Sequence, residues 1–327
     1  MPEQPIILID AFAQIYRGYY AIRYLTNSKQ EPVNAIFAIT KFLLRMHREY
    51  PSSQGAVVFD RGKPAFRMEL APDYKANRPP MPDELRSQLD TIEEMIGAFG
   101  WPKFGDKDFE ADDVIAAIAG DISDAEFIII SADKDLAQLI SPRVKMLVPG
   151  KKGALDIRGP EEVIEKFMVT PEQIIDYLSL IGDSSDNIPG VAGIGPKTAA
   201  TLMAQAGSIN AMLEHPEMIE KEKLRLKVLE SAELLRKNIK LVTLNTNIPA
   251  RPWLEEQAMI RREPDWDKIY ELCETLELKS IIKEIATLRP ANLTNDLFTI
   301  PTISEQPHKK PAPESAQPEK FAPDLFG

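Results

Sequence analysis

Short apolar segments that alternate with helical ones constrain the fold of this chain more than any other feature. Buried strands are indicated at 6–10 (IILID), 55–60 (GAVVFD), 126–131 (EFIIIS) and 144–148, and helical spacing at 35–50, 82–99 and 110–122. Strands that alternate with helices typically form a parallel sheet with crossover helices. We therefore expect an α/β domain with a mostly parallel sheet.

The second half of the chain is predicted to be almost entirely helical. Helices are indicated at 161–167, 171–182, 197–206 and 266–288, together with a long helix at 219–240 that is basic on its polar face. After residue 289 the chain is rich in Pro, Ser, Glu and Lys, and it has too little apolar content to fold alone. We predict an α/β domain over 1–165, a helical region over 166–290 and a disordered tail over 291–327.

Composition narrows the class of protein. No segment approaches the ~20 consecutive apolar residues of a membrane span, and the N-terminus lacks the basic lead of a signal peptide. The single cysteine, Cys273, fits a reducing compartment. We expect a monomer in the cytoplasm without membrane contact. The net charge of −11 argues against a nucleic-acid partner unless many of the acids bind cations.

Nine acidic residues stand where predicted strands end or helices begin. They are Asp10, Asp60, Glu110, Asp112, Asp113, Asp133, Asp135, Asp183 and Asp186. Because the carboxyl ends of parallel strands line the ligand crevice of an α/β sheet, the acids that follow strands should converge there. Glu110 and Asp113 are three residues apart, so one helical face can carry both.

Convergence of so many acids requires cations. Two like charges ~4 Å apart repel by roughly 4 kcal/mol at the effective dielectric of a protein surface. Oxygen ligands without clustered His or Cys favour Mg²⁺ or Mn²⁺, and two such ions can activate water and stabilise the transition state of phosphodiester hydrolysis. The alternative is ordinary helix caps and solvated loop acids, which suits any single Asp better than it suits all nine together.

A glycine-rich turn, GVAGIGPKTA at 190–199, separates two predicted helices. It is not a P-loop, because Pro196 follows Gly195 and Lys197 comes one place late. It also lacks the preceding strand of a dinucleotide-binding fingerprint. A helix–hairpin–helix fits, since its free N–H groups can hold a backbone phosphate. The candidate DNA-binding residues are Gly190, Gly193, Gly195, Lys197 and Thr198, and the alternative is a purely structural αα-hairpin.

A basic stretch lies between the second predicted strand and the acidic helix. It includes Tyr74, Lys75 and Arg78 beside a proline pair. An aromatic side chain next to cations suits base stacking and phosphate contact. Tyr16 and Arg17 repeat the combination after the first strand. Either set taken alone is more often a solvated surface.

Several of these segments together resemble the 5′-nuclease family, meaning flap endonucleases and the 5′–3′ exonuclease domain of bacterial DNA polymerase I. The resemblance covers about residues 5–288 and rests on LIDAFAQIYR, VFDRGKPAFR, DYKANRPPMP, FEADDV, SADKDLAQL, GDSSDNIPGVAGIGPKTA and RREPDW. It implies a PIN-like (resolvase-like) domain with a helical arch near 61–108, followed by a three-helix variant of the hairpin module. Ala11 and Phe109 replace the Gly and Tyr that are common in the family, and neither change removes a ligand.

The resemblance also implies roles for individual residues. The nine acids match ligands of two or more divalent ions. Lys75 and Arg78 match arch cations that contact the scissile region, Tyr74 matches a residue that can stack near it, and Arg17 matches one that approaches the phosphate. The hairpin module of the family grips duplex DNA and often holds K⁺ through backbone oxygens.

The predicted function is that of a metal-dependent 5′–3′ exonuclease and flap endonuclease that leaves 5′-phosphate and 3′-hydroxyl ends. The expected substrates are 5′ flaps, nicked duplexes and RNA primer ends in DNA replication and repair. A non-cleaving DNA-junction binding protein is the main alternative, although such a protein tends to lose the acids. A PIN-type ribonuclease is a second one, although it would be shorter and lack the hairpin. A free-standing nuclease is expected, because the chain ends where a polymerase I would continue. A segment cut from a polymerase I would have the same sequence, so this alternative stays open.

The tail contains the triplet DLF twice, at 296–298 and 324–326. Peptides that bind the bacterial sliding clamp end in similar Leu-Phe pairs after a Gln. Here Thr294 and Ala322 occupy the Gln position, so the match is partial. A linker with incidental apolar residues is the favoured interpretation, and a clamp contact is the alternative.

Overall fold

A six-stranded sheet forms the centre of the computed structural model, which describes residues 4–52, 54–150 and 155–288. The strand order is β3-β2-β1-β4-β5-β6, and all neighbours are parallel except β5 and β6. The strands are β1 Ile6–Asp10, β2 Gly55–Val58, β3 Lys103–Phe104, β4 Phe127–Ile130, β5 Val144–Pro149 and β6 Leu155–Arg158. The mostly parallel sheet predicted from the sequence is confirmed. The two edge strands were not predicted, because β3 is two residues long and β6 (LDIR) is not an apolar run.

Helices cover both faces of this sheet. Along β1, Ile6 and Leu8 pack toward α6 (Ala111–Asp121), while Ile7 and Ile9 pack toward α1 (Ala11–Ala21), α2 (Asn34–Glu49) and α5 (Leu89–Ala98). A strand buried on both faces is apolar at every position, which explains why these strands are continuous apolar runs in the sequence.

The helix predicted at 82–99 is interrupted. It consists of α4 (Asp83–Arg86) and α5, with Gln88 between them. The Gln88 amide donates to Asn34 Oδ1 (3.0 Å) and to the Glu84 carbonyl (2.9 Å), and its oxygen accepts from Ala35 N (2.9 Å). This buried glutamine therefore ties the start of α2 to the start of α5.

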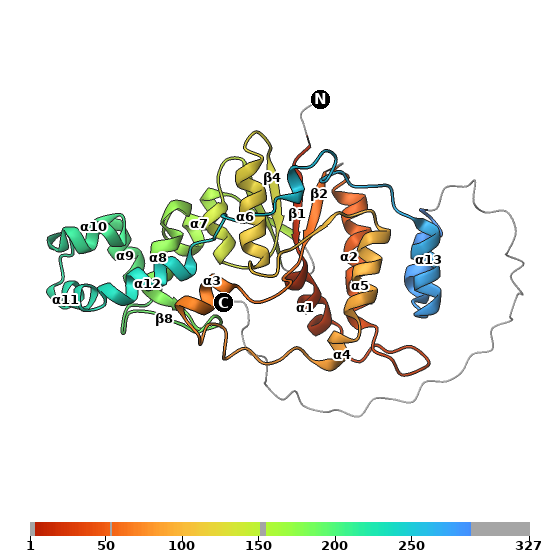
Figure 1. Cartoon of the computed structure of the whole chain (residues 1–327), viewed down its shortest axis with the longest axis horizontal. Helices are drawn as coiled ribbons and strands as arrows, with labels where there is room; N and C mark the ends of the chain where they lie inside the picture. Colours follow the sequence, from red (N-terminus) through yellow and green to blue (C-terminus); the bar gives the residue numbers. More distant parts are fainter. Residues whose placement is uncertain (1–3, 53, 151–154, 289–327) are drawn as a thin grey trace, which may run out of the picture.

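The helical region extends from one end of the sheet domain (Figure 1). It contains α7 Pro160–Phe167, α8 Ile174–Ile181, α9 Pro196–Ala206, α10 Ile209–Glu214, α11 Glu222–Glu230 and α12 Ala232–Val242. The single long helix predicted at 219–240 is thus two helices that meet at Ser231. The remaining elements are α3 Ala65–Leu70, the strand pair β7 Gly182–Asp183 and β8 Ile188–Pro189, and short 3-10 turns at Asp135–Leu139, Pro171–Gln173, Pro216–Met218 and Pro252–Leu254.

The chain then returns to the α/β domain. Ile260 forms a β-bridge with Gln54, and Arg262 N donates to the Gly100 carbonyl. The last predicted helix is two helices, α13 Trp266–Thr275 and α14 Lys279–Ile285, which pack against α5 and α2. The end of the helical region is therefore fastened to the far side of the sheet domain (Figure 1).

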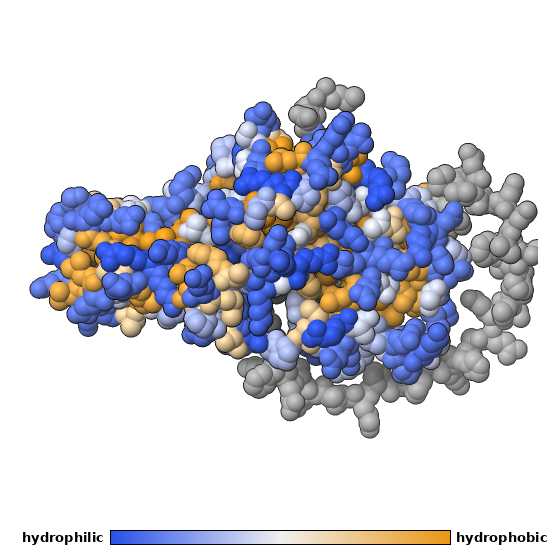
Figure 2. Space-filling model, viewed as in Figure 1, coloured by the Kyte–Doolittle hydropathy of each residue, from blue (hydrophilic) through white to orange (hydrophobic). Residues whose placement is uncertain are grey.

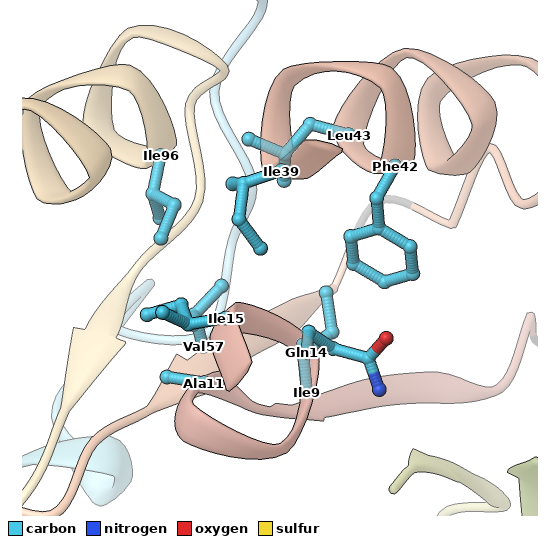
Figure 3. A pocket seen from close by; sticks show the side chains of 9 residues that line it. All are labelled: Ile9, Ala11, Gln14, Ile15, Ile39, Phe42, Leu43, Val57 and Ile96. Atoms are coloured by element: carbon cyan, nitrogen blue, oxygen red, sulfur yellow. The ribbon is translucent and has the colours of Figure 1, made fainter. Parts of the chain in front are cut away.

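Neither the surface nor the core gap points to the functional site. The face shown in Figure 2 is mostly hydrophilic, and no helix among the described residues is long and apolar enough to cross a membrane. A small gap between α1, α2 and the sheet is lined by Ile15, Ile39, Phe42 and Val57 (Figure 3). Its almost wholly apolar lining marks a packing gap in the core, so the functional groups must be sought elsewhere.

Candidate active site

The carboxyl ends of the central strands bring the first acids together. Asp10 ends β1, caps α1 by accepting from Ala13 N (3.1 Å), and accepts from Ser131 Oγ (2.8 Å) at the end of the neighbouring β4. Asp60 follows β2 and accepts from Ala111 N (2.8 Å), which ties it to the start of α6. Asp10 is buried, so its charge is largely shielded from water.

The N-terminus of α6 adds Glu110 and Asp112 to the same edge. Glu110 is the N-cap residue of α6. Among the charges that raise the pKa of Asp112 are those of Asp133, Asp10 and Asp60. We call Asp10, Asp60, Glu110, Asp112 and Asp133 the first acid group.

A second acid group joins the sheet domain to the helical region. One carboxylate oxygen each from Asp135, Asp183 and Asp186 lies within 4.8 Å of the others. Asp183 lies in the strand pair β7–β8, directly after α8. The two groups are neighbours, because the charges of Asp183 and Asp186 both raise the pKa of Asp133. The predicted convergence of acids at this edge is thus found in the structure.

The clustered acids have perturbed protonation equilibria. Burial, reinforced by Asp60, raises the pKa of Asp10 to about 7. Burial also raises the pKa values of Asp60, Asp112, Asp133 and Asp135, in each case with help from a neighbouring carboxylate. The pKa of Asp186 shifts the other way, because Lys75 and Arg78 outweigh its burial and lower it. Several carboxyl groups that resist ionisation lie in one place, and a cation bound beside them would favour their ionised form.

The arch residues Lys75 and Arg78 lie directly on the acids. Lys75 Nζ contacts Glu110 and lies 3.5 Å from Asp186 Oδ2, and Arg78 Nη2 lies 2.5 Å from Asp186 Oδ1. Lys75 adopts a left-handed backbone conformation (φ 56°) and its N–H donates to the Asp186 carbonyl (3.0 Å). Only part of the segment 61–108, in which the arch was predicted, lies over the acids, because α5 and β3 belong to the sheet domain.

Tyr74 is placed differently from its predicted role. Its side chain is 6% exposed and its hydroxyl lies 3.0 Å from Glu110 Oε2 and 2.9 Å from Asp186 Oδ2. A buried ring that bridges two carboxylates cannot also present a free face to a base. The stacking role expected from its position beside cations is therefore not supported, and Tyr74 instead links the two acid groups.

Asp113 also departs from expectation. It is 1% exposed, and both of its oxygens are engaged by the buried Arg67 at 2.6 and 2.8 Å. They also accept from the backbone N–H groups of Glu110 (3.1 Å) and Asn245 (2.7 Å). The three-residue spacing does place Asp113 beside Glu110, but its partners argue against a role as a direct metal ligand.

The glycine turn lies beyond the second acid group and is partly structural. A Cβ at Gly190 would lie 2.2 Å from the Ile181 carbonyl oxygen, so this glycine permits β7 and β8 to pair. Gly193 (φ 78°) and Gly195 are exposed, and Gly195 is the N-cap of α9. Lys197 and Thr198 follow in the first turn of α9. The predicted hairpin between α8 and α9 is present, with its exposed side open to a ligand.

Arg17 does not join the acids. It lies on α1, and partial burial together with the neighbouring Arg45 lowers its pKa. The expectation that it approaches the scissile phosphate has no contact to support it among the described residues.

The contacts of four polar residues near the site were not predicted from the sequence. Ser131 bridges Asp10 and Asp133, Lys134 lies 3.2 Å from Asp183 Oδ1, Arg67 pairs with Asp113, and Lys227 Nζ donates to the Ala192 carbonyl at the glycine turn (2.5 Å). Ser131 and Lys134 could have been found, because both lie in the segment that carries the third strand's acids. Arg67 lies in the basic stretch and Lys227 in the helix predicted to be basic, but neither pattern indicates the partner, since each partner is distant in sequence.

Comparison with family models matches the chain in two consecutive parts. Residues 5–168 match "5′-3′ exonuclease, N-terminal resolvase-like domain", and residues 169–267 match "5′-3′ exonuclease, C-terminal SAM fold". Together they include both acid groups, the arch and the glycine turn. The PIN-like (resolvase-like) fold and the helical region expected from the sequence are confirmed.

Curated relatives include both long and short proteins. DNA polymerase I of Thermus thermophilus is 37% identical over 295 residues, which cover 89% of this chain and 34% of the polymerase. The chain thus spans about a third of the length of that relative. The 5′-3′ exonuclease of Aquifex aeolicus is 36% identical over 282 residues, which cover 86% of this chain and 94% of that protein.

Solved structures share the fold. T5 5′-exonuclease with bound divalent metal ions (zinc) superposes with a TM-score of 0.63 at 23% identity, covering 86% of this chain and 98% of that one. The catalytic core of Rad2 in complex with a DNA substrate superposes with a TM-score of 0.57 at 17% identity, covering 88% and 93%. At these identities the likeness concerns the fold alone.

Proposed function

The chain belongs to the 5′–3′ exonuclease family, and from this premise we propose that it hydrolyses DNA phosphodiester bonds as a metal-dependent 5′–3′ exonuclease and flap endonuclease. The observation that carries the proposal is the convergence of two acid groups beneath two arch cations. We propose 5′ flaps, nicked duplexes and RNA primer ends as substrates, in DNA replication and repair.

The residues present fit hard divalent cations. The donors are carboxylates without His or Cys, which is the ligand set of Mg²⁺ or Mn²⁺. The second acid group already gathers three carboxylate oxygens within 4.8 Å. In the first acid group, burial and neighbouring carboxylates raise the pKa values of Asp10, Asp60, Asp112 and Asp133, which shows that their negative charges are not fully compensated by nearby cations. We propose that the first acid group and the second acid group each hold at least one ion. Bound there, such ions would activate water and neutralise charge on the attacking and leaving oxygens.

Lys75 and Arg78 supply the protein's own positive charge at this edge. Their ammonium and guanidinium groups lie against Glu110 and Asp186, so a phosphate placed between the acid groups meets both cations. Donors held in place before the reaction stabilise developing negative charge without a cost of reorganisation. We propose that these two residues orient the scissile phosphate and stabilise its transition state.

The pH dependence of stability offers one test of ion binding. The folded protein keeps the Asp10 proton up to about pH 7, whereas the ordinary pKa of this side chain is 3.8. The folded state therefore binds more protons than the unfolded state between these values, and this contribution to stability falls as the pH rises through them. A bound divalent cation removes that penalty in competition with the proton. We expect Mg²⁺ to raise the thermal unfolding midpoint more at about pH 8 than at about pH 5.5.

Differential scanning calorimetry with and without chelator measures this effect, and an Asp10→Asn variant is the control that should reduce the difference. Equal Mg²⁺-induced shifts at both pH values would contradict the expectation.

The hairpin between α8 and α9 is proposed to hold a backbone phosphate of the duplex. Gly193, Gly195, Lys197 and Thr198 present backbone N–H groups, an ammonium and a hydroxyl on its exposed side. The Lys227 ammonium, which bonds the Ala192 carbonyl, adds a further cation at the turn. We also propose that backbone oxygens of the turn bind K⁺.

A Gly193→Ala substitution should weaken DNA binding. A Cβ at this position would lie 2.5 Å from Lys227 Nζ, and φ is 78°, which favours glycine. The turn must then shift or release Lys227. We expect the Kd for a nicked duplex to rise about fivefold to tenfold, equivalent to about 1–1.4 kcal/mol.

Fluorescence anisotropy in the presence of chelator measures this Kd without cleavage. Gly120→Ala is the matched control, because no atom lies within 4 Å of its Cβ position at the end of α6. Unchanged affinity of the Gly193 variant, or an equal loss in the control, would remove the turn from the DNA interface.

A cleavage assay on a 5′-labelled flap duplex tests the proposed function itself. We expect short 5′ products in Mg²⁺, none in chelator, and none from an Asp133→Ala and Asp135→Ala double variant. If the parent bound the flap without cutting it in Mg²⁺ or Mn²⁺, the non-cleaving junction-binding alternative would replace the nuclease. Cleavage of single-stranded RNA with no activity on DNA flaps would favour the ribonuclease alternative.

The remaining expectations stay proposals. The family models divide the chain at residue 168, close to the proposed boundary at 165. The proposed disordered tail and both DLF triplets lie outside the described residues. A monomeric state, a cytoplasmic location and a sliding-clamp contact are likewise proposed on the sequence alone.

A further inference from the structure

Arg67 lies buried where the base of the arch meets the end of α12. Its side chain is 3% exposed. The Nε–H donates to the Leu241 carbonyl (2.9 Å) and Nη2 donates to the Thr243 carbonyl (3.3 Å). Both acceptors belong to the C-terminal end of α12, whose last carbonyls have no partner within the helix. This arginine of the α/β domain therefore closes the end of a helix in the helical region.

The other donors of Arg67 reach the start of α6. Nη1 and Nη2 form the two bonds to Asp113, and Nη1 lies 3.1 Å from Glu110 Oε2. Asp113 in turn holds the backbone N–H of Asn245, just beyond α12. The five N–H donors of the guanidinium are thus matched by five oxygen contacts.

The helix α12, whose end Arg67 caps, also holds the segment that contains part of the second acid group. Asn238 on α12 is fully buried and donates to the carbonyls of Ser179 (3.0 Å) and Pro189 (2.7 Å). These carbonyls lie on either side of the segment that contains Asp183 and Asp186. The position of α12 therefore sets the position of the segment that contains those two acids.

From these contacts we propose that Arg67 is a positioning residue that sets the distance between Glu110 and the pair Asp183 and Asp186. It holds Glu110 directly, and it holds the other two through the end of α12 and Asn238. The inference rests on the proposed function, in which the two acid groups hold ions that act together. Lysine has three donors and no planar fork, so it cannot replace the arginine in this role.

Electron paramagnetic resonance of bound Mn²⁺ tests the distance directly, because two Mn²⁺ ions ~4 Å apart show spin–spin coupling. In the parent protein we expect a coupled pair. In Arg67→Lys we expect Mn²⁺ to bind with weakened or absent coupling, a kcat for flap cleavage lower by about 10- to 100-fold, and a KM for DNA near that of the parent. Arg251→Lys is the matched control, because Arg251 also bonds one carboxylate (Asp121) and two carbonyls (Ile248 and Thr246), away from the acids.

A second variant separates positioning from stability. Arg67→Met with Asp113→Asn removes both charges of the buried pair, which avoids an unpaired charge. If Arg67 positions the acids, this double variant folds and still loses the coupled Mn²⁺ signal. A variant, Lys or Met, that keeps both parental coupling and parental kcat overturns the proposal. A parent protein with no coupled pair overturns the two-ion function and, with it, this inference.

Discussion

An Asp112→Asn variant is expected to lose flap cleavage by about 100- to 1,000-fold and yet to unfold at a higher temperature than the parent in chelator. Burial raises the pKa of Asp112 well above its ordinary value, and the charges of Asp133, Asp10 and Asp60 raise it further. Without cations this carboxyl group destabilises the folded protein near neutral pH. An amide of the same shape removes the charge, so stability rises while a proposed ion ligand is lost.

Two measurements check this expectation together. Calorimetry in chelator at about pH 7.5 gives the unfolding midpoint, and single-turnover cleavage in Mg²⁺ gives the rate. Asp124→Asn is the control, because this exposed acid lies just beyond the opposite end of α6 and should change neither quantity. A variant that melts below the parent, or that cuts at the parental rate, would show that Asp112 is not held as a desolvated ligand.

Replacing Arg67 alone should have the largest effect on folding. Its pair with Asp113 is buried, with 3% and 1% of the two side chains exposed. Loss of one partner leaves an uncompensated buried charge, which typically costs about 3–5 kcal/mol. We therefore expect Arg67→Met to lower the free energy of unfolding by about that amount in urea denaturation.

A double-mutant cycle with Asp113→Asn provides the control. Because the two side chains share their hydrogen bonds, the double variant should be more stable than the sum of the single effects predicts. Additive losses would show that the pair is not coupled. A loss for Arg67→Met of the size seen at an exposed ion pair, about 0–1 kcal/mol, would place this arginine outside the buried core.

Much of the acid cluster was predictable because parallel strands end at one edge. Asp10 ends β1, while Asp60 and Asp133 follow β2 and β4, and the three acids meet because these strands are neighbours in the sheet. The hairpin at the glycine turn was also predictable, because the turn lies between two predicted helices and its lysine comes one place too late for a P-loop. The resemblance to the family then allowed roles to be expected for individual acids.

Other features depended on partners far away in the sequence. Asp113 looks like a ligand from its spacing to Glu110, but Arg67 and the chain after α12 occupy its oxygens. Tyr74 looks like a stacking residue from its neighbours, but its ring is buried and its hydroxyl bridges two acids. No local pattern encodes either outcome.

By itself the sequence determined the α/β class, the order of the main strands and helices, and the set of acids that face one edge. These depend on the periodicity of apolar residues and on the position of each acid at an element's end, both of which are local properties. Only the tertiary structure decided which acids are free to bind ions, which are tied to arginine, and how the helical region is fastened to the sheet. Those choices depend on contacts such as Arg67 to Leu241, 174 residues apart, which form only when the two halves of the chain pack together.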